Sequence, residues 1–145
     1  MSNLLRHIGI VVQNLDENIR FWSKIMGFKI AKKMEEKGKH IDLITGLEEV
    51  KVTTVKLSDN ESNVVELLKF HSHPDKKEWQ GKPFSTGITH LALTVENISL
   101  MIKKLNEEGY VNCVEPQISP DGKVKVIYAK GPEGLILELV QILNK

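Results

Sequence analysis

The sequence has little cysteine, no long apolar run and no excess of charge of either sign. Its one cysteine, Cys113, cannot form an internal disulfide, which is typical of proteins in a reducing compartment, and we expect it to be a small buried residue. No apolar stretch approaches the roughly 20 residues of a membrane-spanning helix, and the N-terminus lacks the apolar core of a signal peptide. The sequence therefore predicts a cytoplasmic protein that does not interact with membranes.

The balance of charge also argues against nucleic acid as a partner. The chain has 20 basic and 19 acidic residues, interspersed along its length, and a net charge of +1. A nucleic-acid-binding protein usually concentrates its basic residues in a patch or stripe. With 145 residues and 41% hydrophobic content, the chain fits one ordinary globular domain, spanning residues 1–145, that can bury a core.

One ten-residue pattern is present twice, at 5–14 and 88–97. Apolar and small or polar residues alternate in both copies, which predicts two half-buried β-strands. The copies match in register, because His7 aligns with His90 and each copy ends in asparagine. A repeat of this kind predicts two similar modules that place equivalent residues around a pseudo-twofold axis.

Each predicted strand is followed by an amphipathic helix. Asn14 is a suitable N-cap for the first helix, with Glu17 at the capping-box position, and Asn97 or Ser99 caps the second. A glycine ends each helix and leads into a new apolar segment, at 28–31 and 110–114. The residues expected on the buried helix faces are Leu15, Ile19, Trp22 and Met26 in the first helix, and Ile98, Ile102 and Leu105 in the second.

The remaining segments complete two modules of the order strand–helix–strand–strand–strand, at about 5–70 and 88–142. A polar linker at 71–87, with two prolines and two glycines, joins them. Further strands are expected at 50–57, 63–70, 123–129 and 135–142, a short helical turn at 41–47, an exposed strand end or turn at 32–39, and a hairpin turn at 131–134.

Two glutamates occupy matching positions in the last strand of each module. Glu66 and Glu138 lie within apolar strands, where an unpaired carboxylate is costly to bury. Taken singly, these glutamates and the histidines of the first strands are ordinary strand residues. Their repetition favours a divalent-metal site, because two carboxylates and two imidazoles supply four ligands and leave a position for water or substrate. The His71 and His73 pair has no acidic partner in register and is more simply a pair of exposed loop residues.

These motifs resemble the vicinal oxygen chelate superfamily, which includes glyoxalase I, methylmalonyl-CoA epimerase, extradiol dioxygenases, and fosfomycin- and bleomycin-resistance proteins. The resemblance extends over residues 5–142. It implies an α+β fold in which tandem βαβββ modules form a cup-shaped mixed sheet. The segments that carry it are 7–12, 21–22, 27–28, 89–95 and 131–139.

The resemblance also implies the site and its chemistry. The first and last strands of each module would supply the metal ligands, His7, Glu66, His90 and Glu138, for Zn, Ni, Co or Mn. The protein would be a lyase or isomerase, and by resemblance a homodimer. A small substrate with vicinal oxygens would lose a proton beside its carbonyl and pass through an enediolate. Glu138 is the first choice of base and Glu66 the second, while the small Gly9 leaves space beside the histidine.

Other functions of this superfamily remain open at this point. One is metal-free binding of a small molecule, as in bleomycin-resistance proteins, and others are a metal-dependent thiol transferase or a dioxygenase. Val11 and Phe70 stand where bacterial glyoxalase I has the arginine and asparagine that bind glutathione, which argues against that thiol. Residues 129–132 likewise replace the His-Pro-Lys segment that is common in epimerases.

Overall fold

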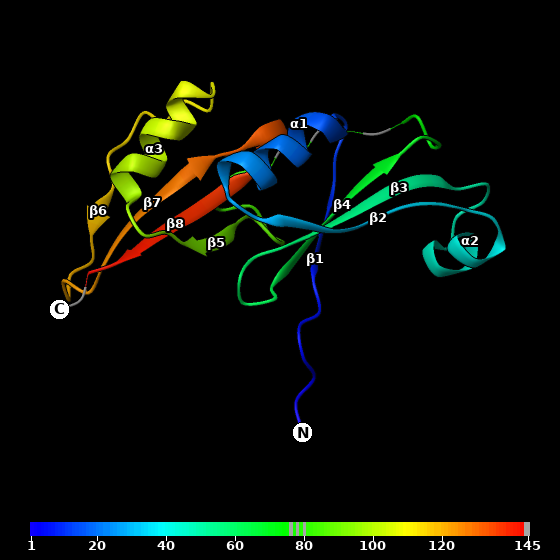
Figure 1. The fold of residues 1–145 in the computed structure, drawn as a ribbon, viewed down its shortest axis with the longest axis horizontal. Coiled ribbons are helices and arrows are strands. Elements are labelled where there is room, and N and C mark those ends of the chain that lie inside the picture. The colour runs from blue at the N-terminus through cyan, green and yellow to red at the C-terminus, as the bar shows by residue number, and fades with distance from the viewer. Residues whose placement is uncertain (76, 78, 80, 144–145) are drawn as a thin grey trace. The chain divides into compact units, whose positions relative to one another are not determined.

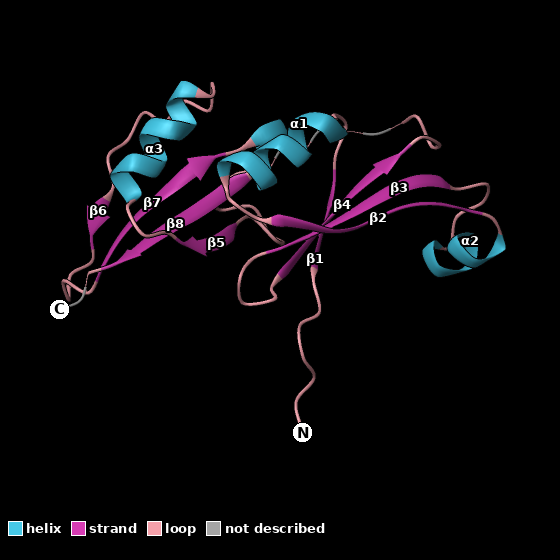
Figure 2. Ribbon diagram, viewed as in Figure 1, coloured by secondary structure: helices cyan, strands magenta, loops and turns pink. Residues whose placement is uncertain are grey.

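The structure is a computed structural model and describes residues 1–75, 77, 79 and 81–143. The chain divides into two compact units, Met1–Lys77 and Glu78–Lys145 (Figure 1). Each unit contains one four-stranded mixed sheet, built in the order strand, helix and three further strands (Figure 2). The predicted α+β class and the tandem βαβββ order are therefore confirmed.

In the first unit, the first and last strands lie side by side. The sheet has the order β1-β4-β3-β2, in which β1 runs parallel to β4 and the other neighbours are antiparallel. Parallel neighbours need a crossover connection, and here two helices, a π-helical turn and two strands lie between them in the chain. The elements are β1 (Ile8–Val11), α1 (Leu15–Arg20), the π-helical turn η1 (Phe21–Ile25), β2 (Lys29–Lys37), α2 (Lys39–Thr45), β3 (Lys51–Ser58) and β4 (Val64–Phe70).

The first helix starts where the sequence predicts but buries a different face. The Asn14 side chain accepts a hydrogen bond from the backbone N–H of Glu17 at 3.0 Å, which confirms the N-cap. After α1, the Met26 N–H bonds to the Phe21 carbonyl oxygen, which gives a π turn. Such a turn adds a residue and rotates the face that follows. The buried residues are Asn18, Phe21, Trp22 and Ile25. Of the expected stripe, Trp22 is buried as predicted, whereas Leu15, Ile19 and Met26 are half-buried.

The two sides of the first sheet have different roles. Alternate residues of β3 and β4 form the core beneath α1, and Val55, Leu57 and Leu67 are completely buried there. The opposite side, which we call the Glu66 face, carries Glu66 and every second residue of β4 to either side of it. At one end of this face, Ile41 of α2 packs in a cluster with Val50, Val52, Leu68 and Phe70.

The second unit repeats this strand order, but its described residues include no helix between its second and third strands. Its sheet has the order β5-β8-β7-β6, with β5 parallel to β8. The 131–134 segment forms a short 3-10 turn between the last two strands, close to the predicted hairpin turn. The elements are β5 (Leu91–Thr94), α3 (Ile98–Glu107), β6 (Gln117–Ile118), β7 (Val124–Lys130), η2 (Pro132–Gly134) and β8 (Ile136–Ile142).

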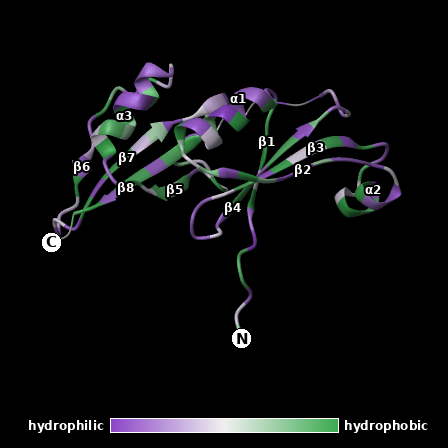
Figure 3. Ribbon diagram, viewed as in Figure 1, coloured by the Kyte–Doolittle hydropathy of each residue, from purple (hydrophilic) through white to green (hydrophobic). Residues whose placement is uncertain are grey.

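Helix α3 confirms the amphipathic pattern expected for it. The Asn97 side chain caps it by accepting from the Leu100 N–H at 3.0 Å. Ile98 and Leu105 are fully buried against β7 and β8. The Ile98 N–H, one of the free donors of the first turn, bonds to the Gln141 side chain at 2.9 Å, so α3 is tied to the last strand. Figure 3 shows both hydrophobic and hydrophilic residues along this helix.

Two expectations for the second unit are wrong. The apolar segment 110–114 follows the helix where the second strand of the module is expected, but it forms no strand, and that strand is the two-residue β6 further along. Side-chain hydrogen bonds explain the loop, because the Asn112 N–H bonds to the Asn106 side chain and the Asn112 carbonyl oxygen Oδ1 accepts from the Lys130 N–H. Cys113 lies in this loop and is exposed, not buried.

In the first unit, the segment expected to be a strand end or turn at 32–39 is mostly strand. Residues up to Lys37 belong to β2, which pairs with β3 along its length. Short-range composition did not predict this because the strand is largely exposed and rich in lysine and glutamate. Within the described parts of the chain, no helix is long and apolar enough to cross a membrane.

Candidate metal centre

The first module places a histidine and a glutamate side by side. His7 directly precedes β1, and Glu66 lies in the middle of β4, the parallel neighbour of β1. The His7 Nε2 atom is 3.4 Å from Glu66 Oε1. Gly9 is the register partner of Glu66, so no side chain of β1 stands directly beside the carboxylate.

The second module contains the equivalent pair. His90 directly precedes β5, and its Nε2 atom is 3.1 Å from Oε1 of Glu138 in β8. Ala92 is the register partner of Glu138, as Gly9 is of Glu66. The sequence repeat therefore corresponds to a repeat of side-chain geometry within each unit.

The strand pattern fixes the direction in which each glutamate points. On either side of Glu138 in the sequence, Leu137 and Leu139 are fully buried on the opposite side of β8. Their burial against the helix side forces Glu138 to the other side of the sheet, because successive strand residues alternate. The neighbours of Glu66, Val65 and Leu67, are also buried and have the same effect.

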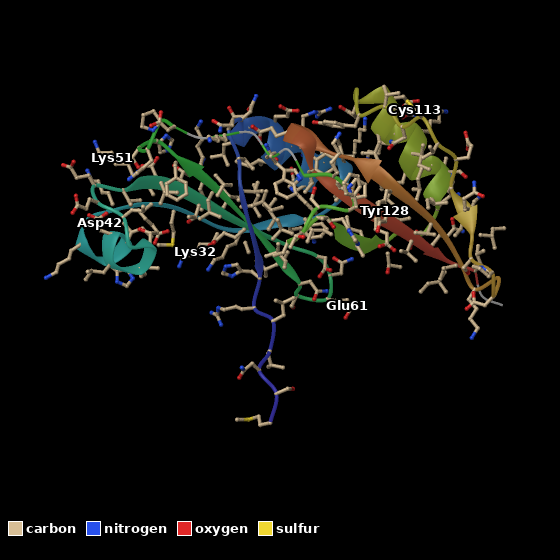
Figure 4. All side chains as sticks on the ribbon, turned by 180° about the vertical axis from the view of Figure 1, so that it is seen from behind. Lys32, Asp42, Lys51, Glu61, Cys113 and Tyr128 are labelled. Atoms are coloured by element: carbon tan, nitrogen blue, oxygen red, sulfur yellow. The ribbon has the colours of Figure 1, made fainter. Side chains whose placement is uncertain are left out.

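Each pair has one further neighbour, and these neighbours differ. In the first module Lys56 of β3 is the register partner of Glu66, and its Nζ atom is 3.9 Å from Glu66 Oε2. In the second, Tyr128 of β7 is the register partner of Glu138, and its ring centroid is 4.8 Å from that of His90. Figure 4 labels Tyr128.

Sequence reasoning missed Lys56 and Tyr128, although a signal for each exists. The predicted turn at 59–62 joins the strands that contain Lys56 and Glu66, and the length of a hairpin turn sets the register of its strands. Counting back from that turn brings Lys56 opposite Glu66, as the structure has it. The predicted turn at 131–134 gives the same signal for Tyr128, because Lys130 pairs with Ile136 across the turn and counting back brings Tyr128 opposite Glu138.

The donor chemistry of both pairs fits a divalent metal. Imidazole nitrogen and carboxylate oxygen are ligands for Zn, Ni, Co and Mn. In the second pair, His90 Nδ1 shares a 3.0 Å hydrogen bond with the Thr89 hydroxyl, which fixes the ring and leaves Nε2 toward Glu138. Metal-bound histidines are commonly oriented by such a bond at the other nitrogen.

The four side chains of the two His–Glu pairs are neither fully buried nor fully exposed. Exposure is 30% for both histidines, 15% for Glu66 and 26% for Glu138. Solvent and a small molecule can therefore reach each pair. Among the described residues, no group of three or more His, Cys, Asp or Glu side chains is gathered in one place, so each unit contributes a pair of donors.

The two histidines of the linker do not form a comparable pair. His71 Nε2 lies 2.7 Å from the Thr53 hydroxyl, and His73 Nδ1 lies 2.8 Å from the Ser72 hydroxyl. Each ring is held by a local hydroxyl, and no acidic residue is paired with either ring among the described residues. Their geometry favours a role in the linker structure.

Known proteins share this sequence and fold along nearly the whole chain. The chain is 29% identical over 139 residues to the uncharacterized protein YwkD of Bacillus subtilis (strain 168), which covers 94% of this chain and 95% of YwkD. It is 26% identical over 141 residues to a probable lactoylglutathione lyase of Synechocystis sp., which covers 97% of each chain. The structure matches the crystal structure of a glyoxalase family protein from Bacillus cereus with a TM-score of 0.86 and 25% identity, covering 99% of this chain and 97% of the other.

The family assignment rests on the sequence match to a whole-family model. Residues 4–139, which include both His–Glu pairs, match the model of the Glyoxalase/Bleomycin resistance protein/Dioxygenase superfamily. This match confirms the resemblance that the repeated motifs indicated. The chain therefore belongs to the Glyoxalase/Bleomycin resistance protein/Dioxygenase superfamily.

Proposed function

We propose that the protein is a divalent-metal-dependent lyase or isomerase of the glyoxalase and epimerase type. His7, Glu66, His90 and Glu138 would be the four protein ligands of one ion. The observation that carries the proposal is the repeated pair, with a histidine nitrogen 3.1–3.4 Å from a glutamate oxygen at equivalent positions of both modules. The proposal holds equally whether the two pairs come from one chain or from two copies of it.

The chemistry fits a substrate with two neighbouring oxygens. A divalent ion bound at these residues would polarise the substrate carbonyl and so make the adjacent C–H more acidic. The small register partners Gly9 and Ala92 leave the glutamates unobstructed from the first strand of each module. A Cβ added at Gly9 would contact the Leu68 side chain at 3.4 Å, so Leu68 forms part of the wall beside Glu66.

Glu138 is the proposed base for the proton on carbon. Its side chain is more exposed than that of Glu66, at 26% against 15%, and no lysine is paired with it among the described residues. Glu66, by contrast, has one oxygen 3.9 Å from the Lys56 ammonium group, which competes with a substrate for that carboxylate. Glu138 would accept the proton from the substrate and, in an isomerase, return it at a different position or face.

Metal content of single histidine variants tests the proposed site. Wild-type protein purified without chelator should contain a divalent ion, whereas His7→Ala and His90→Ala should each lose most of it, because each removes one of four ligands. His40→Ala is a matched control, since His40 is an exposed histidine of α2. Elemental analysis provides the measurement. Metal contents in both variants equal to the wild type would refute the proposal.

We also propose that the protein is a homodimer, as members of the superfamily often are. Multi-angle light scattering at micromolar concentration measures the molar mass directly. A dimer should give twice the chain mass of 16.4 kDa. A mass of one chain at that concentration would show that the protein works as a monomer.

A further inference from the structure

A row of charged side chains crosses the first sheet at the level of Glu66. The register partners from one edge of the sheet to the other are Lys32 in β2, Lys56 in β3, Glu66 in β4 and Gly9 in β1. Paired residues of neighbouring strands project from the same side of a sheet. Lys32, Lys56 and Glu66 therefore share the Glu66 face, and Figure 4 shows Lys32 on the side of the strands where α2 lies.

An irregularity in β2 brings a third lysine to this face. The register shifts between Ile30 and Lys32, so that Lys29 pairs with Ser58 while Lys32 pairs with Lys56. In a regular strand, residues three apart project from opposite sides, but a bulge shifts the alternation by one residue. Lys29 and Lys32 consequently project from the same side, and bulges are frequent beside active sites for this reason.

The positive charge of this row is not balanced by its carboxylates. Lys32 lies directly opposite Lys56, an arrangement of like charges that is unfavourable without a counter-ion. Among the described residues, neither Lys29 nor Lys32 makes an ion pair, and Lys56 pairs only with Glu66 at 3.9 Å. The other acid on this face, Glu36, lies further along β2, where it accepts a hydrogen bond from Thr54.

Metal binding would increase the imbalance. This step rests on the proposed function, in which Glu66 directs its carboxylate to a divalent ion. Lys56 would then lose its carboxylate partner while a divalent cation is added nearby. A solvent-accessible group of three cations and a metal attracts an anion, because only a negative group satisfies all of them.

We propose that the lysine row formed by Lys29, Lys32 and Lys56 binds an anionic group of the substrate, a phosphate or a carboxylate. Lys56 is the central member, because it lies between the other lysines and Glu66 and is one-third exposed. The substrate class is thus a small molecule with vicinal oxygens and a negatively charged arm. The first module recognises the arm through Lys56, which acts as a specificity residue next to the metal ligand.

Two probes that differ by one phosphate group test this assignment. Dihydroxyacetone and dihydroxyacetone phosphate both have a carbonyl oxygen and a neighbouring free hydroxyl, but in the second the other hydroxyl is esterified to phosphate, which provides the anionic arm. On metal-loaded protein, isothermal titration calorimetry should show at least about 10-fold tighter binding of the phosphate compound, which corresponds to one charge-assisted hydrogen bond. Sodium chloride should reduce the difference, because the lysines are partly exposed.

Variants of the lysines distinguish phosphate binding by the lysine row from direct binding of the phosphate to the metal ion. Lys56→Met should remove most of the preference, Lys56→Arg should restore it, and Lys32→Met should reduce it less. Lys51→Met is the matched control, since Lys51 belongs to the same strand and is exposed on the opposite side of the sheet. Equal affinity of wild type for the two probes, or an undiminished preference in Lys56→Met, would overturn the proposal.

Metal analysis and inorganic anions distinguish this proposal from the proposed function. Metal bound at His7 and His90 without any effect of Lys56→Met would refute the lysine row alone. Inorganic phosphate and acetate, titrated into the same variants with and without metal, show whether the row selects phosphate or carboxylate. Phosphate binding that depends on Lys56 in a protein that takes up no metal would refute the metal site and retain the row. If the protein neither takes up metal nor binds phosphate through Lys56, both proposals are refuted.

Discussion

The two modules share a strand order and a His–Glu pair but differ in what surrounds the pair. In the first, a nine-residue β2 and the helix α2 extend the sheet and its Glu66 face, and Lys56 lies beside the glutamate. In the second, β6 has two residues, no helix corresponds to α2 among the described residues, and Tyr128 occupies the position equivalent to Lys56. The shared parts contain the candidate ligands, and the parts that differ include the lysines of the proposed anion site.

The largest effect on stability is expected from residues that both modules share. Leu67 and Leu139 each follow the glutamate of their module and are completely buried. Leu67→Ala and Leu139→Ala should each lower the free energy of unfolding by about 2–5 kcal/mol, because truncation leaves a cavity in a packed core. Urea denaturation measures the change, with the exposed Leu100→Ala as a control. A loss in one variant only would show that the modules do not contribute alike.

The two glutamates should differ in catalysis although their geometry is similar. Glu138→Gln keeps an oxygen ligand but cannot accept a proton, so it should retain metal and lose at least ~100-fold in rate. Deuterium exchange of the C–H next to the carbonyl of dihydroxyacetone phosphate, followed by NMR, measures this step without knowledge of the natural substrate. Glu66→Gln is the matched variant and should lose less. The reverse order would assign the base to the first module.

The smallest expected effect concerns the helix caps, which are alike in both modules. Asn14 and Asn97 each accept a backbone N–H at 3.0 Å at the start of a helix. Replacement by alanine should cost about 1 kcal/mol in each case, since one helix donor loses its partner. Thermal or urea unfolding is sensitive enough to compare the two, with the exposed Glu96→Ala as a neighbouring control. A negligible cost at Asn14 would show that this side-chain hydrogen bond does not stabilise the first helix.

The sequence predicted the repeated features well because they depend on short-range rules applied twice. Asn14 and Asn97 cap helices. His7 matches His90 in the repeat and Glu66 matches Glu138, and each histidine lies beside its glutamate. A single helix or strand with this pattern would have been ambiguous. Its second occurrence made the prediction specific.

The wrong predictions concern segments where long-range contacts override local composition. Residues 110–114 are apolar enough for a strand, but hydrogen bonds from Asn112 to an earlier helix and a later strand keep them in a loop. The π turn after α1 changed which residues are buried, and no simple 3.6-residue period anticipates it. Lys32 could be placed next to Lys56 only after the bulge in β2 was known.

The parallel pairing of the first and last strands has a consequence for the order of events during synthesis. Gly9 pairs with Glu66, and Ala92 pairs with Glu138, so each pairing closes almost the full length of its module. Strand pairings between distant residues form late, because the entropy cost of closing a long loop must be met before their contacts can compensate for it. A nascent chain that ends before residue 66 contains a histidine without its glutamate. Each His–Glu pair can therefore form only after its module has been synthesised through the glutamate, and a module truncated before that residue lacks the pair.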